Sequence, residues 1–180
     1  MVYLLAGPKG TGKTQQMIEQ ANEAAKKCNG NVVFIKKTHR DTASVTFDIR
    51  TICMDDFPAI TNIDEYIGFL YGMYSSNHDI EYVFIDGILK HADISLDNIP
   101  AFIDRLKQVS KECEVEFYVS ISANKEELAD VNTEGCKSFL LRQNDPTVHF
   151  TNGLSFYVTI RYKKQKGRSD NPAMYRRENV

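Results

Sequence analysis

The sequence predicts an α/β protein of three layers, with a mainly parallel β-sheet, helices on both faces, a C-terminal hairpin and a basic tail. Two observations carry this prediction. Short, continuous apolar runs alternate with amphipathic segments of helical period, and such alternation is typical of a parallel sheet with right-handed crossovers. A glycine-rich stretch also follows directly behind the first apolar run. Together they place the first strand, a turn and the first helix at the N-terminus.

The expected strands are short runs rich in β-branched and aromatic residues. Uninterrupted apolar runs are expected of strands that are buried on both faces of a sheet. Residues 48–54 form a less apolar run, which we expect to be a short edge strand. The four buried strands are expected at 2–6, 32–35, 82–86 and 115–122, and the polar segment 38–47 is expected to be a loop.

Three longer helices and one short one are expected between these strands. The helix at 62–74 begins with a capping box, Asn62 followed by Glu65. In the helix that ends near residue 113, Asp97 or Asn98 is the cap and Pro100 lies in the first turn. The first helix is expected at 14–28, where Asn29-Gly30 provides a stop, and a short helix at 125–131.

The C-terminal part differs in charge from the rest of the chain. Residues 137–180 carry a charge of +6 and residues 1–136 a charge of −8. We therefore expect a core domain over 1–136, a hairpin extension over 137–162 built on an Asn-Gly turn, and a basic, disordered tail over 163–180. Such a tail can meet an anionic partner such as nucleic acid or a neighbouring subunit, or can simply be solvated.

The four cysteines are widely spaced and lack a histidine at ligand spacing, which argues against a structural zinc site. The longest aromatic and apolar stretch, 66–74, is too short to span a bilayer. The N-terminus also lacks the pattern of a signal peptide, because two lysines follow an apolar run of five residues. These observations predict a cytoplasmic protein without a membrane span.

The glycine-rich stretch matches the phosphate-binding pattern G-x-x-x-x-G-K-[ST], in its required context between a strand and a helix. Glycines let the backbone approach a ligand closely, and the N–H groups of the loop converge on phosphate oxygens at the positive end of the helix. The lysine reaches the β- and γ-phosphates, and the hydroxyl of the last residue coordinates Mg²⁺. The predicted nucleotide-binding residues are Gly7, Pro8, Lys9, Gly10, Thr11, Gly12, Lys13 and Thr14.

Other polar residues follow the remaining strands. Ligands of parallel α/β sheets bind at the carboxyl ends of the strands, where residues 7–14, 36–41, Asp86 and 120–122 are all expected. Asp86 ends an apolar run, as expected of a carboxylate that holds Mg²⁺ together with Thr14. Lys13 and Asp86 are therefore the predicted catalytic residues.

On these residues the chain resembles the RecA-like and thymidine-kinase-like P-loop NTPases. The resemblance covers about residues 1–125. The chain is also similar to small bacterial proteins that are labelled PilT-like. It implies a P-loop NTPase fold, ATP or GTP with Mg²⁺, and a sheet in which the 117–122 strand lies between the 2–6 and 82–86 strands. A basic residue after the last strand reaches a neighbour's nucleotide in some hexameric members, and Lys163, Lys164, Lys166 and Arg168 are the candidates here.

The chain departs from this family at the position after Asp86. Many members have Glu there, to polarise water or a substrate hydroxyl, whereas this chain has Gly87. His39 or Asp41, after the second strand, are candidates for that role, with a solvated basic loop as the alternative. Ser120 and Ser122 either orient the γ-phosphate or water, or are ordinary strand-end hydroxyls.

Three functions follow as hypotheses. The first is Mg²⁺-dependent binding of a nucleoside triphosphate, with ATP expected, and hydrolysis that is slow or needs a partner residue. The second is a kinase of the thymidine-kinase-like type that acts on a nucleoside or another small molecule. The third is a nucleotide-binding switch module without enzymatic activity.

Overall fold

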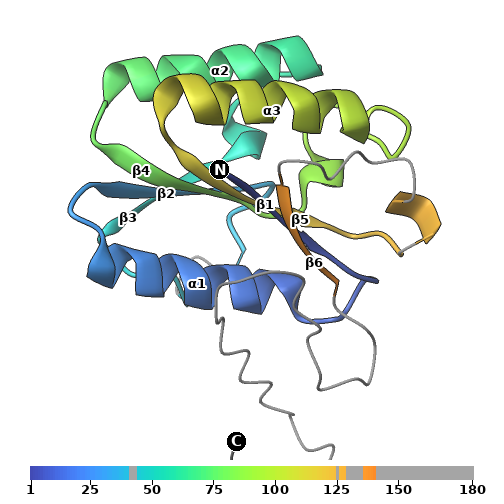
Figure 1. Cartoon of the computed structure of the whole chain (residues 1–180), viewed down its shortest axis with the longest axis horizontal. Helices are drawn as coiled ribbons and strands as arrows, with labels where there is room; N and C mark the ends of the chain where they lie inside the picture. Colours follow the sequence, from blue (N-terminus) through green and yellow to red (C-terminus); the bar gives the residue numbers. More distant parts are fainter. Residues whose placement is uncertain (41–43, 125, 129–135, 141–180) are drawn as a thin grey trace, which may run out of the picture.

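The computed structural model describes residues 1–40, 44–124, 126–128 and 136–140. The expected hairpin over 148–162, the tail over 163–180 and Asp41 lie outside these ranges. The described part forms three layers, with a β-sheet between one helix on one face and two helices on the other (Figure 1). The α/β class and the layered arrangement are as predicted.

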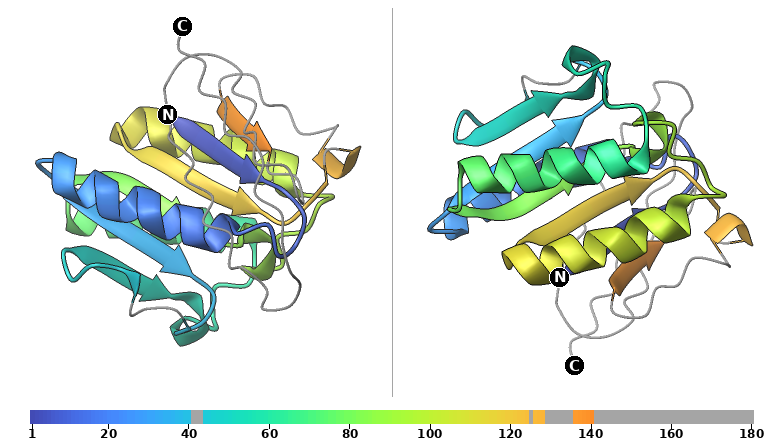
Figure 2. Two further views of the ribbon diagram at one scale, coloured as in Figure 1. Left: turned by 90° about the horizontal axis from the view of Figure 1, so that it is seen from below. Right: turned by 90° about the horizontal axis from the view of Figure 1, so that it is seen from above.

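The six strands in the described part of the chain pair in the order β3-β2-β4-β5-β1-β6, and every pairing among them is parallel. Strand β5 lies between β1 and β4, as the resemblance implies, and β3 is the expected edge strand (Figure 2). The strands are β1 (Val2–Ala6), β2 (Asn31–Lys36), β3 (Ile49–Cys53), β4 (Ile80–Ile85), β5 (Glu116–Ile121) and β6 (Cys136–Leu140).

Strand β6 was not predicted from the sequence. It pairs in parallel with β1, in the register Val2 to Cys136, and forms the second edge of the sheet. Its sequence mixes Lys137 and Ser138 with apolar residues, so it lacks the continuous apolar run by which the central strands were recognised. The segment that begins at 137 therefore starts inside a strand of the sheet.

The helices lie close to their expected positions. They are α1 (Lys13–Lys27), α2 (Ile63–Ser76) and α3 (Ile99–Cys113), and short 3-10 turns lie at η2 (Met54–Asp56), η3 (Ile88–Lys90) and η4 (Glu126–Leu128). Asn62 caps α2, because its side chain accepts a hydrogen bond from the Glu65 backbone N–H at 3.0 Å, while the Glu65 carboxylate accepts one from the Thr61 N–H at 2.6 Å. Asn98 precedes α3 but does not cap it with its side chain and instead accepts a bond from the Ser95 N–H.

Each face of the sheet has its own apolar core. Helix α1 covers one face, where Met17 and Ala21 are fully buried against strand residues such as Phe34. Helices α2 and α3 cover the other face (Figure 1), where Phe102 packs edge-on against Tyr66. No helix in the described part of the chain is long and apolar enough to cross a membrane.

Candidate functional site

The glycine-rich loop between β1 and α1 has the backbone conformation that its glycines permit. Gly10 and Gly12 have φ angles of 87° and 83°, in the left-handed region that residues with a β-carbon avoid. The Thr11 hydroxyl donates to the Pro8 carbonyl at 2.9 Å, and the Gly7 N–H donates to the Ile121 carbonyl at 3.2 Å. The loop is therefore folded on itself and tied to the end of β5.

Lys13 begins helix α1 and is buried, with 6% of its surface exposed. Its ammonium donates to the backbone carbonyls of Gly7 and Pro8, both at 2.7 Å. Burial lowers the pKa of Lys13, while the nearby Asp86 carboxylate acts in the opposite direction. The side chain thus folds over the loop, and its charge lies where the N–H groups of the loop begin the helix.

The carboxylate of Asp86 connects three elements at the carboxyl edge of the sheet. Its Oδ2 accepts a hydrogen bond from the Thr14 hydroxyl at 2.8 Å, and its Oδ1 accepts one from the Ser120 hydroxyl at 2.7 Å. The Ser120 oxygen in turn accepts a bond from the Gly87 N–H at 2.7 Å. A threonine hydroxyl beside a carboxylate is a pair of oxygen donors of the kind that Mg²⁺ prefers. These residues therefore fit a magnesium ion.

A pocket of about 270 Å³ opens beside this carboxylate. It lies between the start of α1 and the ends of β2 and β4, on the β2 side of Asp86. Four of its lining residues are cationic and one is acidic. The lining residues are Thr14, Ile18, Phe34, Lys36, Lys37, Thr38, Arg40, Val45, Asp86 and Lys90.

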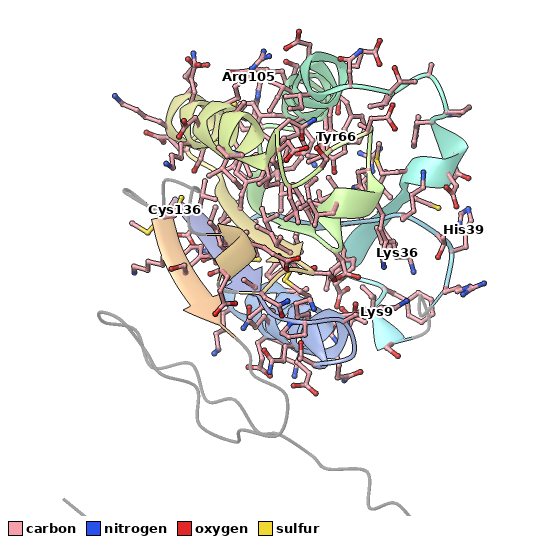
Figure 3. All side chains as sticks on the ribbon, turned by 90° about the vertical axis from the view of Figure 1, so that its right-hand side faces the viewer. Lys9, Lys36, His39, Tyr66, Arg105 and Cys136 are labelled. Carbon is pink, nitrogen blue, oxygen red and sulfur yellow. The ribbon has the colours of Figure 1, made fainter. Side chains whose placement is uncertain are left out.

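Some predicted residues are not drawn into this arrangement. The Lys9 and Ser122 side chains are exposed, and neither lines the pocket. His39 is also exposed, and its Nε2 lies 2.9 Å from Asp56 Oδ1. Figure 3 shows His39 at the outer side of the molecule and Lys36 further in. Asp41 lies outside the described residues, so among the candidates after β2 only His39 is placed, and it pairs away from Asp86.

The fold brings His39, Cys53 and Asp56 together, although no spacing in the sequence pairs a cysteine with a histidine. Their potential ligand atoms lie within 4.8 Å of one another. Two hydrogen bonds account for this arrangement. The Cys53 thiol donates to the Lys37 carbonyl at 3.2 Å, and His39 pairs with Asp56. The cluster thus holds the end of β2 against β3 and the η2 turn.

The sequence reasoning missed two residues behind and beside Asp86. Lys90 lines the pocket, in the short turn that follows β4. His91 is buried, with 1% of its surface exposed, and its Nδ1 shares a hydrogen bond of 3.1 Å with the Tyr66 hydroxyl. The signal for Lys90 was its position four residues after the strand-end carboxylate. The burial of His91 could not be predicted, because a single histidine in a polar turn is not part of a periodic apolar pattern.

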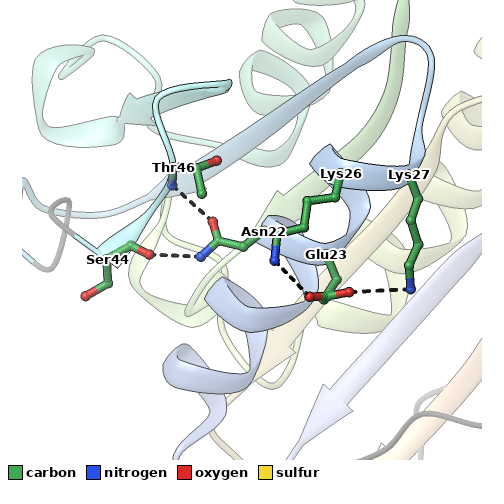
Figure 4. Close-up of polar contacts among 6 residues, drawn as sticks. All are labelled: Asn22, Glu23, Lys26, Lys27, Ser44 and Thr46. Atoms are coloured by element: carbon green, nitrogen blue, oxygen red, sulfur yellow. Dashed lines mark hydrogen bonds and ion pairs between the residues drawn. The ribbon is translucent and has the colours of Figure 1, made fainter.

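Asn22 of α1 holds the loop that forms one wall of the pocket. Its side chain donates to the Ser44 carbonyl and accepts from the Thr46 N–H, both at 3.0 Å, so that it clamps the backbone on both sides of Val45 (Figure 4). We expect Asn22→Ala to lower the free energy of unfolding by about 1–2 kcal/mol and to speed hydrogen exchange at the Thr46 amide.

The matched control for Asn22 is Glu23→Ala, on the next position of the same helix. Glu23 contacts only the exposed Lys26 and Lys27 in Figure 4, and exposed pairs of this kind contribute little. Mass-spectrometric hydrogen exchange on both variants checks the prediction. Equal exchange rates at Thr46 in the two variants would contradict the clamp.

No protein-family model matches this chain, and no curated protein matches it.

Proposed function

We propose that the protein binds a nucleoside triphosphate with Mg²⁺ at the loop Gly7–Thr14, with ATP as the expected nucleotide and GTP as the alternative. The observation that supports this most is the 2.8 Å hydrogen bond between the Thr14 hydroxyl and Asp86. The two residues are 72 positions apart in the chain. They meet at the one sheet edge where a phosphate-binding loop and a metal-binding carboxylate need to meet.

In this proposal each group has one task. The N–H groups of the loop and of the start of α1 bind phosphate oxygens. The Lys13 ammonium gives up its hydrogen bonds to the Gly7 and Pro8 carbonyls and donates instead to the outer phosphates. Thr14 and Asp86 would hold the magnesium ion, which neutralises charge on the phosphates when bound. Ser120 keeps the Asp86 carboxylate in place through a bond of 2.7 Å.

We further propose that hydrolysis is slow or depends on a partner residue. Water attacks a phosphate faster when a side chain orients it. In the described part of the chain, Asp86 is the only carboxylate that lines the pocket, and its two oxygens already accept the Thr14 and Ser120 hydroxyls. Gly87 has no side chain, and His39 pairs with Asp56 instead.

A switch module without enzymatic activity is the second candidate. The lack of a water-orienting side chain beside Asp86 among the described residues favours it, since a site that binds Mg²⁺ and a nucleotide without such a side chain keeps the nucleotide unhydrolysed. The two functions differ in one measurement, the release of phosphate from bound ATP over hours. Tight binding with no release favours the switch.

The test of the proposed function is the binding of ATP by calorimetry, with and without Mg²⁺. We expect Lys13→Ala to weaken binding roughly 10- to 100-fold, because a charged donor to the phosphates is lost. Asp86→Asn is expected to lose the gain in affinity that Mg²⁺ gives while keeping the weaker metal-free binding.

Lys26→Ala is the matched control, because Lys26 lies at the far end of the same helix with an exposed side chain paired to Glu23. It is expected to bind ATP as the wild type does. If wild-type protein binds neither ATP nor GTP in the presence of Mg²⁺, the proposed function is wrong and the loop is only a turn.

A further inference from the structure

The pocket beside Asp86 shares two residues, Thr14 and Asp86, with the proposed magnesium site. Its lining comes from α1, from the ends of β2 and β4 and from the segments after them, and it includes no residue of 7–13. Strand β5 separates β4 from β1, where the loop begins. The lining residues other than Thr14 and Asp86 therefore belong neither to the loop nor to the proposed magnesium site, and they can contact another ligand.

The polarity of the pocket is that of a site for an anion. Lys37, Arg40 and Lys90 line it, and the Lys36 ammonium bonds to the Arg40 carbonyl and so holds the turn on which Arg40 lies. Lys37 is also paired with Asp55 at 3.1 Å. Both members of that pair are partly exposed, so their attraction is screened by water and competes weakly with a bound anion.

Lys90 lies close to Gly87, the residue directly after Asp86. A β-carbon built on Gly87 would lie 3.5 Å from Lys90 Cδ and from its Nζ. Lys90 lines the pocket, and its ammonium makes no hydrogen bond or ion pair within the described residues. Its charge therefore remains to be balanced by an anion in the pocket.

The inner part of the pocket is apolar. Ile18 and Phe34 are 4% and 1% exposed, and Val45 packs against the same core. The loop that contains Val45 is held in place by Asn22. Ligand sites commonly combine such an apolar wall with a few charged groups that fix orientation. A bare inorganic ion would leave this wall without a contact.

We propose that this pocket binds a second, small ligand, an organic phosphate with an apolar or aromatic body, at the same time as the nucleotide. Several cations in one pocket match a doubly charged phosphate better than a singly charged carboxylate. Simultaneous binding rests on the proposed function, whereas the pocket itself does not. The ligand class is that of a phosphorylated second substrate or effector.

Phenyl phosphate is the probe for this proposal. Calorimetric titration is carried out with wild-type protein, alone and saturated with Mg²⁺ and a non-hydrolysable ATP analogue. We expect phenyl phosphate to bind in both states, inorganic phosphate to bind more weakly, and phenol not to bind. The double variant Arg40→Met, Lys90→Met keeps the aliphatic stems and is expected to lose roughly tenfold or more in affinity for the probe, with nucleotide affinity within about twofold of wild type.

Two further variants make the outcomes distinguishable. Lys26→Met is the matched control and is expected to bind the probe as the wild type does. Lys13→Ala is expected to bind the nucleotide more weakly but to keep its affinity for phenyl phosphate. If the wild type binds phenyl phosphate but no nucleotide, the proposed function is overturned and the pocket proposal stands. The proposal is overturned if phenyl phosphate competes with the nucleotide for one site, or if the double variant binds it unchanged.

Discussion

Replacing Phe102 with alanine is expected to lower the free energy of unfolding by about 3–5 kcal/mol. The Phe102 side chain is fully buried in the core between the sheet and helices α2 and α3. Its ring lies 5.7 Å from the Tyr66 ring in an edge-on contact, which adds to the loss of buried apolar surface. Both helices border the cavity that the substitution would create, so the site has little room to collapse.

Chemical denaturation of wild type and variant checks this expectation, provided that the slope of the transition is unchanged. Phe47→Ala is the matched control, because the Phe47 side chain is fully exposed. It is expected to change stability by no more than about 0.5 kcal/mol. A loss below about 1 kcal/mol for Phe102→Ala would mean that α3 is not packed on the sheet as described.

The second large effect is a loss of stability in mild acid that depends on His91. The pKa of His91 is lowered to about 4, mainly by burial and also by the ammonium groups of Lys37 and Lys90, while the Asp86 backbone and the Asp55 carboxylate act in the opposite direction. The unfolded chain therefore binds a proton near pH 6.5, and the folded chain binds it only near pH 4.

The sign follows from this difference in proton binding. The contribution of neutral His91 to the free energy of unfolding is fully present above about pH 6.5. It is lost as the pH falls from there to about 4, where the loss reaches about 3 kcal/mol. Unfolding curves at half-unit steps of pH measure it. His91→Gln is expected to flatten the curve between pH 4 and 6.5.

His78→Gln is the control for this experiment, because His78 is exposed at the end of α2. It is expected to leave the pH dependence of wild type in place. If His91→Gln and wild type lose the same stability between pH 6.5 and 4, then His91 is not the group that titrates.

The central part of the fold could be predicted because its signals are local. The runs at 32–35 and 82–86 are apolar without a break, and Asn62 and Glu65 mark the start of a helix by side-chain chemistry alone. The meeting of Thr14 with Asp86 could also be predicted, because parallel strands present their carboxyl ends at one edge. The distance of 2.8 Å between them agrees with that expectation.

The remaining features depend on contacts between distant segments. Strand β6 is an edge strand with polar residues, so its pairing with β1 is decided by the sheet and not by its own pattern. Tyr66 is fully buried because it packs against both His91 and Phe102, which lie in other segments of the chain. The cationic pocket likewise combines residues from three separate segments, and only their charges were visible in the sequence.

The bonds of Lys13 have a consequence for the speed of ligand binding. Its ammonium is held by two carbonyl oxygens of its own loop, so a phosphate has to exchange with partners that are already in place. Part of the attraction between the lysine and an incoming phosphate therefore offsets the loss of these bonds. Association then includes a rearrangement within the protein as well as an encounter, and its observed rate should level off at high ligand concentration instead of rising in proportion to it.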